Sequence, residues 1–344
     1  MQKVILIFES AITYRNHSGI RKMYEEYNPP DVPMEYVVSA ISRFFPKMRD
    51  LSIKFHYHGT YNVYLVDNRY MFRVASAFIS HNDARNLILH EANILNKLRE
   101  HLSFKIPNPE FIDVESKHPV MGYEMLPGES LSRCYDKTTT TEQIELAKQI
   151  AEFLGELHAP EMNTLFKDKK NFNPEEYRNE WKTVYTNVQD LVYPQLQQSS
   201  IKWIDHLFTD FLENKVNFQF TPRLIHGDFD TSNILVDAKT MKVTSIIDFE
   251  ETRIYDSAVD FLFFREGMIF LRTLLETYPH GFDLGFQNRM IFQFGRQPLL
   301  YILYGLKHDI ESMVTYGYSE LKKRISDWKK YESMLDNIFS SSEI

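Results

Sequence analysis

The sequence is poor in cysteine, in positive charge and in long apolar runs. Among its 344 residues Cys134 is the only cysteine, which excludes an internal disulfide and a cysteine-based zinc site and fits a reducing compartment. The formal net charge is −8, which argues against a general nucleic-acid-binding protein and is compatible with a cationic small-molecule substrate. The sequence also lacks internal repeats, a Walker loop and a dinucleotide-binding fingerprint.

No apolar run in the sequence reaches the length of a membrane-spanning helix. The apolar start Val4–Phe8 is too short for a signal-peptide core. The longest later run, Val259–Leu275, is interrupted by Arg265 and Glu266. The length suggests two or three domains or lobes, and the hydrophobic content of 43% is enough for a sizeable core. We therefore expect a cytoplasmic protein, a monomer or weak dimer, that binds neither nucleic acid nor membranes.

The most informative stretch spans residues 224–250 and reads LIHGDFDTSNILVDAKTMKVTSIIDFE. It holds Asp228, then Asn233 five residues later and, after an apolar run, Asp248. The residues between Asn233 and Asp248 read as two strands joined by a turn, which would bring Asp248 back beside Asn233. This order suits phosphoryl transfer, which requires a positioned acceptor hydroxyl and neutralisation of phosphate charge by a divalent metal.

Each polar residue of this stretch has an expected role in that chemistry. Asp228 would accept the proton of the acceptor hydroxyl, while Asn233 and Asp248 would supply oxygen ligands to Mg²⁺. We expect His226 to fix the backbone of the loop rather than to take part in chemistry. The alternative is a structural hairpin whose polar residues only cap turns.

The segments HGDFDTSN and IIDFE resemble the catalytic and metal-binding signature of the aminoglycoside phosphotransferase family, small-molecule kinases that share the protein-kinase fold. The resemblance covers residues 35–330. It implies an α+β, bilobal protein-kinase-like fold with a small antiparallel-sheet N-lobe and a mainly helical C-lobe. The expected domains are a nucleotide-binding N-lobe at 34–126 and a C-lobe at 127–344 that carries the catalytic loop and the acceptor site.

Residues 1–33 fit the family least well and are expected to form an N-terminal extension. They are either an appended strand and helix on the small lobe, or the translated upstream part of a gene that starts at Met34. From Met34 the pattern predicts a short amphipathic helix.

The N-lobe is predicted to begin with three strands, and Asp67-Asn68-Arg69 forms the tight connection between the last two. The resemblance places Arg73 at the strand cation that touches the α- and β-phosphates, where lysine is usual. Glu91 falls among the apolar positions of the following helix, where a carboxylate is costly unless paired, so we expect it to pair with Arg73. The alternative places Glu91 at the edge of the stripe, in water.

Two further features of the N-lobe bear on the nucleotide. Gly59 is the only glycine in the expected phosphate-binding turn. His56 and His58 are expected to point to the same side of their strand, with no third ligand that would make a metal site.

The connection between the lobes resembles the GYxxxxG pattern of the family. This implies that Tyr123 is the gatekeeper beside the base, and that backbone groups of Glu124 and Leu126 hydrogen-bond the purine. The size of Tyr123 would affect the choice between ATP and GTP.

In the C-lobe, Thr139 to Glu142 has the spacing of a capping box and predicts a helix that extends to His158. His158 is expected to be a satisfied core or boundary histidine. Residues 161–221 are rich in aromatics and predict two or three helices, which in this family also wall the acceptor site. Asp260 is expected to brace the catalytic loop through hydrogen bonds.

Three acidic residues after the metal ligand, Glu250, Glu251 and Asp256, are the candidates for contacting a polyamine substrate. The alternative interpretation, to which we give equal weight, is that they form a solvated acidic loop. The sequence therefore predicts a kinase that transfers the γ-phosphate of ATP or GTP, with Mg²⁺, to a hydroxyl of a cationic small molecule.

An aminoglycoside is the best single guess for the acceptor, which would make the protein an antibiotic-resistance enzyme. The alternatives are a metabolic kinase acting on choline, homoserine or a sugar, and a nucleotide-binding relative without catalysis. The second alternative is motivated by Arg73 and by the glycine-poor turn.

Overall fold

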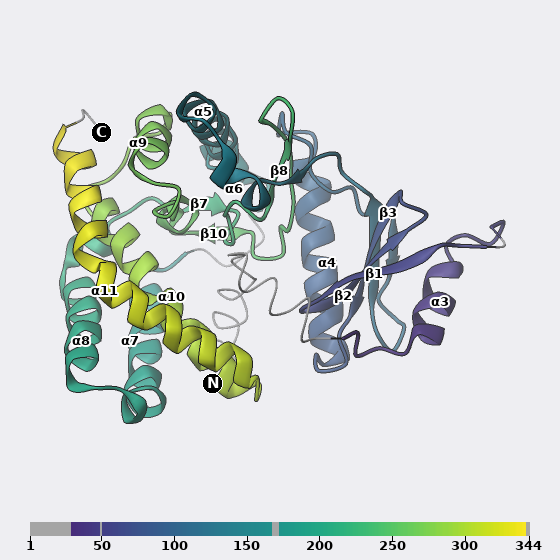
Figure 1. Ribbon diagram of the computed structural model, residues 1–344, viewed down its shortest axis with the longest axis horizontal. Helices are drawn as coiled ribbons and strands as arrows, with labels where there is room; N and C mark the ends of the chain where they lie inside the picture. Colours follow the sequence, from purple (N-terminus) through teal and green to yellow (C-terminus); the bar gives the residue numbers. More distant parts are fainter. Residues whose placement is uncertain (1–28, 49, 167–171, 342–344) are drawn as a thin grey trace. The chain divides into compact units, whose positions relative to one another are not determined.

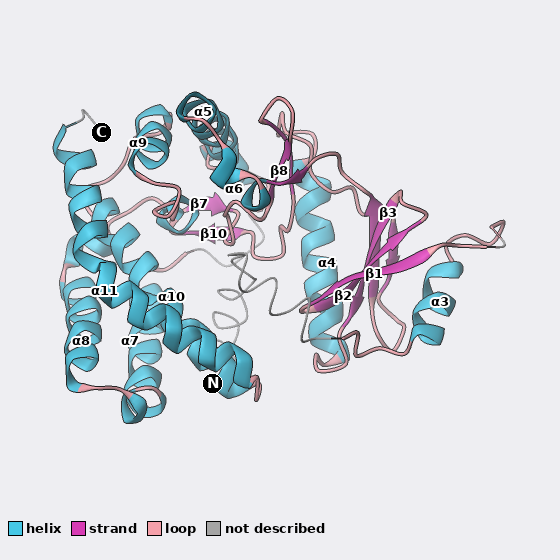
Figure 2. Ribbon diagram, in the orientation of Figure 1, coloured by secondary structure: helices cyan, strands magenta, loops and turns pink. Residues whose placement is uncertain are grey.

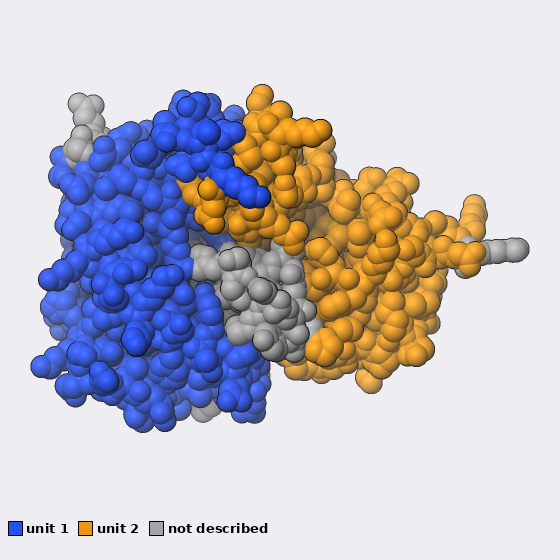
Figure 3. Space-filling model, in the orientation of Figure 1, with its two compact units in different colours: residues 1–13, 137–230, 251–344 blue, residues 14–136, 231–250 orange. Residues whose placement is uncertain are grey.

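The computed structural model describes residues 29–48, 50–166 and 172–341 (Figure 1). The expectation for the extension therefore lies, for residues 1–28, outside the described residues. The described chain divides into two compact units (Figure 3). Unit 1 contains residues 137–230 and 251–341, and unit 2 contains residues 29–136 and 231–250.

Unit 2 is built on a five-stranded antiparallel sheet with the order β1-β2-β3-β5-β4. The strands are β1 (Ile53–His58), β2 (Tyr61–Val66), β3 (Tyr70–Ala75), β4 (Phe111–Asp113) and β5 (Val120–Glu124). Asp67 and Asn68 have positive φ angles of 50° and 52°, a conformation that such two-residue connections require and that Asp and Asn tolerate well. The predicted tight connection between β2 and β3 is thus confirmed.

Two helices cover the opposite faces of this sheet. Because side chains alternate along a strand, Tyr64, Val66, Phe72 and Val74 face one cluster of buried residues that includes α3 (Met34–Ser42). The alternate positions face a second cluster, which includes Ala84, Ile88 and Ala92 of α4 (His81–Leu98). Figure 2 shows α4 running alongside the strands. The side chain of Ser80 accepts a hydrogen bond from the Asp83 amide and caps this helix.

A second, smaller sheet completes unit 2. It consists of β6 (Glu129–Ser130), β8 (Ile234–Asp237) and β9 (Lys242–Ile246), in the order β6-β8-β9. The strand β5 ends at Glu124, just before Pro127 and Gly128. Gly128 has φ +113°, and a Cβ there would lie 2.4 Å from the Thr244 hydroxyl, so the turn out of β5 requires glycine.

Unit 1 is mainly helical. Its α-helices are α5 (Thr140–Leu157), α6 (Pro160–Thr164), α7 (Pro174–Leu191), α8 (Gln198–Glu213), α9 (Met268–Thr277), α10 (Phe286–Lys307) and α11 (Glu311–Ser341). A two-stranded antiparallel ribbon pairs β7 (Arg223–Ile225) with β10 (Arg253–Tyr255). Across both units, short 3₁₀ helices occur at Leu131–Arg133, Tyr135–Lys137, Tyr193–Gln195, Lys215–Phe218 and Ser257–Phe261.

The predicted capping box at the start of α5 is present, because Thr139 and Glu142 each accept a hydrogen bond from the backbone amide of the other. The helices predicted between residues 161 and 221 are also present as α7 and α8. The predicted fold class, an antiparallel-sheet N-lobe and a mainly helical C-lobe, is confirmed. In the described part of the chain no helix is long and apolar enough to cross a membrane.

Candidate active site

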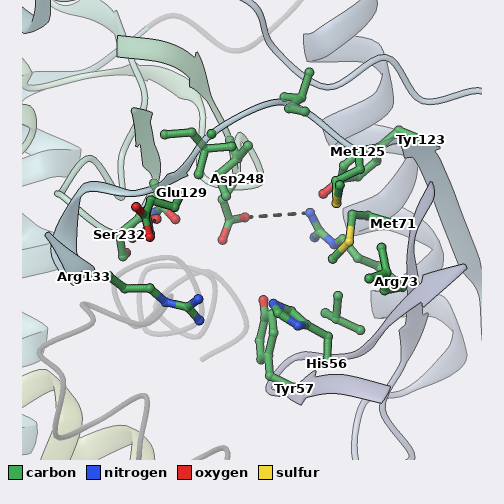
Figure 4. A pocket seen from close by; sticks show the side chains of 18 residues that line it. His56, Tyr57, Met71, Arg73, Tyr123, Met125, Glu129, Arg133, Ser232 and Asp248 are labelled. Carbon is green, nitrogen blue, oxygen red and sulfur yellow. Dashed lines mark hydrogen bonds and ion pairs between the residues drawn. The ribbon is translucent and has the colours of Figure 1, made fainter. Parts of the chain in front are cut away.

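A pocket lies within unit 2, and Figure 4 shows the side chains that line it. Its apolar walls come from β1, β2, β3, β5, the connection after β5, and the β8–β9 hairpin. They include Tyr57, Val63, Leu65, Met71, Tyr123, Met125, Leu126, Leu235 and Ile247. Its polar lining includes Arg73, Asn233 and Asp248. A pocket with apolar walls and a few polar groups is typical of a small-molecule or cofactor site.

The segment after β5 continues beyond the pairing of that strand with β4. The Gly122 carbonyl accepts from the Glu110 amide on one edge, whereas the Met125 amide donates to the Arg69 carbonyl on the other. Since successive residues of a strand present backbone groups to alternating edges, Glu124 and Leu126 share the edge of Gly122. β4 begins at Phe111, opposite Gly122, so its pairing with β5 does not extend to Glu124 and Leu126. The purine contacts expected there remain a prediction, and Tyr123 does line the pocket.

Arg73 is held by carboxylates on the α4 face of the sheet. Its Nη1 lies 2.8 Å from Glu91 and its Nη2 lies 2.8 Å from Glu250, while Asp248 is 3.8 Å from Nη1. Its guanidinium also stacks 4.2 Å from the ring centroid of Tyr61. The expected pair of Arg73 with Glu91 is therefore present, and the alternative that Glu91 faces water is wrong because Glu91 is 0% exposed.

The charges of this cluster shift one another's pKa values. Burial alone would lower the pKa of Arg73, but Glu91 and the neighbouring carboxylates outweigh it and raise that pKa. Burial raises the pKa of Glu91, and Arg73 opposes the shift. The cluster brings Asp248, Glu91 and Glu250 around one cation, so its ionised form has an excess of negative charge that a divalent metal would compensate.

Asn233 and Asp248 lie at neighbouring ends of β8 and β9. The Ile247 amide donates to the Asn233 carbonyl at 3.0 Å, and the side chains of both residues line the pocket. Asp248 has φ +70°, a left-handed conformation that is uncommon for a residue other than glycine and is concentrated at functional sites. The predicted hairpin and the convergence of these two residues are thus observed.

An amide oxygen and a carboxylate are ligands that Mg²⁺ accepts when phosphates and waters complete its shell. Asn233 and Asp248 fit that donor set. In the ranges that the structure describes, no three His, Cys, Asp or Glu side chains gather as a metal site of protein ligands alone.

The loop that carries Asp228 belongs to unit 1 and follows β7. Its backbone is fixed by Asp260, which accepts from the amides of His226 at 2.7 Å and Gly227 at 2.9 Å. Gly227 has φ +91°, and a Cβ there would lie 2.6 Å from the Glu251 carbonyl, so only glycine fits. The bracing role expected of Asp260 is confirmed, and Asp228 is held on this loop at 5% exposure.

Asp260 is in turn fixed by α5. His158 is fully buried, and its Nε2 lies 3.1 Å from Asp260 while its Nδ1 lies 2.9 Å from the Tyr278 hydroxyl. In the neutral ring this arrangement has Nε2–H donating to the carboxylate and Nδ1 accepting from the tyrosine. His158 is the satisfied core histidine that the sequence predicts.

The acidic residues expected to contact a polyamine are engaged with cations of the protein instead. Glu250 pairs with Arg73. Asp256 is 0% exposed and accepts from Arg289 at 2.9 Å and from the Tyr177 hydroxyl at 2.8 Å.

This corrects the expectation for Glu250 and Asp256, because a buried carboxylate needs partners and these two obtain them within the fold. Glu251 lies 3.1 Å from Arg253, whose side chain is 31% exposed.

The two strand histidines do not share a face. The β1–β2 register shifts between Phe55 and Tyr57, and such a bulge re-aims the residues around it. His56 lines the pocket, whereas His58 is buried, with Nδ1 2.8 Å from the Pro29 carbonyl and Nε2 2.9 Å from the Ser76 hydroxyl. The expectation from strict alternation was wrong because the bulge adds one residue.

Sequence reasoning missed two partners of Arg73. Tyr61 lies on the α4 face of the sheet, two residues before Val63. The alternation of side chains along β2 could have predicted that these two residues share a face. Glu250 lies 177 positions from Arg73, and no local pattern connects the two.

The fold and this site together are those of a protein-kinase-like small-molecule phosphotransferase. The family model described as the phosphotransferase enzyme family (APH) matches residues 52–290. The chain belongs to this family.

Solved structures share the fold. The GDP and kanamycin complex of APH(2")-IIIa is 23% identical, has a TM-score of 0.76, and the match covers 86% of this chain and 99% of that one. The ADP-bound aminoglycoside phosphotransferase APH(2'')-Ib is 21% identical with a TM-score of 0.61, and 83% and 96% of the two chains are covered. The macrolide 2'-phosphotransferase MphH from Brachybacterium faecium is 17% identical with a TM-score of 0.61, and 82% and 97% are covered.

Proposed function

We propose that this phosphotransferase moves the γ-phosphate of ATP or GTP to a hydroxyl group of a cationic small molecule, with an aminoglycoside as the first acceptor class to test. The supporting observation is the pocket of unit 2 that Arg73, Asn233 and Asp248 line together with the segment after β5. Because the donor is a nucleoside triphosphate, we place the reaction in the cytoplasm.

In this proposal the nucleotide base lies against Tyr123 and accepts or donates hydrogen bonds at the backbone of Glu124 and Leu126. Arg73 contacts the α- and β-phosphates, and Arg is suited to this because its planar fork can serve several oxygens at once. The GDP and ADP complexes of similar structures support a purine nucleotide. The bulk of Tyr123 beside the base is the feature we expect to influence the choice between adenine and guanine.

Asn233 and Asp248 would hold Mg²⁺, which supplies charge neutralisation at the transferred phosphoryl group when it is bound. Asp228 orients the acceptor hydroxyl and accepts its proton at a carboxylate oxygen. Asp260 and Gly227 act indirectly, because they fix the backbone that carries Asp228. Positioning of this kind is the main contribution a protein makes to phosphoryl transfer.

The acceptor would be recognised by unit 1. We expect the segment with α7 and α8 to contact the acceptor, in place of Glu250 and Asp256. Glu251 remains a candidate for such a contact. The net charge of −8 favours the approach of a cation over that of an anion.

The test is a transfer assay with Mg²⁺ and γ-labelled ATP or GTP against a panel of acceptors. The panel contains aminoglycosides, macrolides, choline, homoserine and simple sugars. Label in an aminoglycoside supports the proposal, and expression in a susceptible bacterial strain should then raise the aminoglycoside concentration that stops growth. The same assay with Tyr123→Ala tests the gatekeeper, and an unchanged ATP to GTP ratio would rule out its influence on the base.

The other outcomes select the alternatives. Transfer only to choline, homoserine or a sugar identifies a metabolic kinase of the same family. Tight nucleotide binding without transfer to any acceptor identifies a non-catalytic relative, and the Asp228 assignment then fails with the rest of the proposal.

A further inference from the structure

Arg73 has two carboxylate partners that approach it from different parts of the chain. Glu91, on α4, lies 2.8 Å from Nη1. Glu250 lies 2.8 Å from Nη2 and follows the β8–β9 hairpin, two residues after Asp248. The side chains of Glu91, Arg73 and Glu250 are 1%, 8% and 6% exposed. Each terminal nitrogen of the guanidinium, Nη1 and Nη2, thus contacts its own buried carboxylate.

The two carboxylates lie behind the guanidinium as seen from the pocket. Arg73 and Asp248 line the pocket, but Glu91 and Glu250 do not. Figure 4 shows the Arg73 guanidinium facing the pocket, in the direction of Asp248. A guanidinium has five N–H donors in a fixed plane, so Arg73 has donors beyond those directed at Glu91 and Glu250 that an anion in the pocket could engage. The two contacts therefore set the plane in which those donors point.

A lysine could not reproduce this arrangement. Its charge sits on a single nitrogen, whereas the fork of Arg73 reaches Glu91 and Glu250 through separate nitrogens. Lysine at this position would leave one of the buried carboxylates without its cation, which is costly. Lysine is the usual residue here in the family, so the departure to arginine and the presence of Glu250 have a common physical explanation.

We propose that Glu250 is a positioning residue for Arg73, and that it makes arginine the required cation at position 73. Glu250 orients the guanidinium and does not touch the nucleotide. The inference rests on the proposed function, because it assumes that Arg73 contacts the phosphates.

The experiment compares four proteins: the wild type, Arg73→Lys, Glu250→Gln and the double variant. The first readout is the rise in unfolding temperature caused by Mg²⁺ with ATP or GTP, and the second is KM for the nucleotide separately from kcat. Arg73→Lys should weaken nucleotide binding by about tenfold or more, and Glu250→Gln by less. The double variant should bind nucleotide about tenfold tighter than Arg73→Lys, since a neutral glutamine no longer demands a second cation.

The coupling in nucleotide affinity separates positioning from a purely structural role. If Glu250 only stabilises the fold, the double variant recovers unfolding temperature without nucleotide, but its KM stays that of Arg73→Lys. Independent effects of the two substitutions on KM would overturn the proposal. As a matched control, Arg85→Lys with Glu115→Gln alters an exposed pair of the same unit, 3.4 Å apart, and should show no coupling.

The wild type distinguishes this inference from the proposed function. If neither ATP nor GTP raises its unfolding temperature, the nucleotide site itself is refuted and the inference falls with it. If nucleotide stabilises the wild type and the substitutions act independently, only the positioning role of Glu250 is refuted.

Discussion

Asp260 joins three separate pieces of unit 1 through one carboxylate. It accepts from the backbone amides of His226 and Gly227 and lies 3.1 Å from Nε2 of His158, the residue that follows α5. This carboxylate is 0% exposed. Its hydrogen bonds hold the loop more firmly than those of a solvated carboxylate, because electrostatic interactions are stronger in the low dielectric of the protein interior. The precision of the Asp228 loop is therefore set by residues outside the loop.

Substitution of Asp228 tests the assigned base at the scale of one residue. Asp228→Asn keeps the size of the side chain and removes its ability to accept the hydroxyl proton, so kcat should fall by about 10² to 10⁴. Nucleotide binding should be unchanged, because Asp228 is not among the residues that line the pocket. Steady-state kinetics and nucleotide titration measure the two effects.

The control for this substitution is Asp210→Asn, which changes an exposed carboxylate of α8 in the same unit. It should leave kcat unaffected. Retention of full activity by Asp228→Asn would show that another group accepts the proton.

The buried His158 predicts a pH dependence of stability. Burial lowers the pKa of His158 in the folded chain, although Asp260 opposes this shift. In the unfolded chain histidine has a pKa of ~6.5. The unfolded chain therefore takes up the proton more readily than the folded chain. The contribution of His158 to the free energy of unfolding is therefore complete above about pH 6.5 and is lost as pH falls through the lower folded pKa. Chemical denaturation at a series of pH values measures this loss.

His158→Gln should lower the free energy of unfolding at pH 7.5 by about 1 to 3 kcal/mol, because buried groups lose their partners. It should also lose less additional stability than the wild type between pH 7 and pH 5. His206→Gln, at an exposed histidine of α8, is the control and should keep the wild-type slope. An identical slope in His158→Gln would exclude this residue as the source.

At the scale of elements, hydrogen bonds join the segment just before α3 to residues around the β1–β2 turn. Asp31 accepts from the Asn62 side chain at 2.6 Å and from the Ala77 amide at 2.7 Å. The Pro29 carbonyl lies 2.8 Å from His58, which in turn contacts Ser76. These contacts support the turn that contains Gly59, since the Ser76 hydroxyl donates to the Gly59 carbonyl at 2.8 Å.

These contacts predict that the chain does not tolerate a start at Met34. Such a chain lacks Asp31 and also Val32, which is 2% exposed in the core beneath α3. Asp31→Ala alone should lower the free energy of unfolding by about 1 to 3 kcal/mol, mainly because the buried Asn62 side chain loses its acceptor. Denaturant unfolding measures it.

Glu35→Ala, an exposed acid four residues further on, serves as the control for Asp31→Ala and should change stability far less. A protein that begins at Met34 and unfolds like the full chain would show that these contacts contribute nothing, and would favour the interpretation of residues 1–33 as a dispensable upstream translation.

The elements that could be predicted are those encoded by local patterns. The capping box of Thr139 and Glu142, the Asp67-Asn68 turn and the hairpin from Asn233 to Asp248 each depend on residues within about twenty positions of one another. The pairing of Arg73 with Glu250 and of Asp31 with Asn62 joins residues 177 and 31 positions apart. Such contacts are fixed by tertiary structure, so the local pattern of acids after Asp248 was open to a substrate-binding interpretation.

At the scale of the whole molecule, nucleotide and acceptor should protect different parts of the chain from hydrogen exchange. The pocket is lined only by residues of unit 2. Mg²⁺ with nucleotide should therefore slow exchange first in β2, β3, the segment after β5 and the β8–β9 hairpin, by an amount that grows with ligand concentration over Kd. Acceptor added afterwards should protect peptides of α7 and α8.

The same experiment can contradict this prediction. Nucleotide protection confined to α7 and α8, with none in unit 2, would show that the pocket is not the nucleotide site. Peptides from α11 serve as an internal reference, because that helix contributes no residue to the pocket.

Unit 2 is discontinuous along the chain: residues 231–250 return to it after the first helices of unit 1. A gene fragment that ends near residue 136 would thus encode a sheet with Arg73 and Tyr123 but would lack the wall of the pocket that contains Asn233 and Asp248. Conversely, everything between residues 137 and 230 is an excursion whose two ends join the same unit. Exchange of that excursion between related genes would replace α7 and α8 and leave the residues that line the pocket of unit 2 untouched.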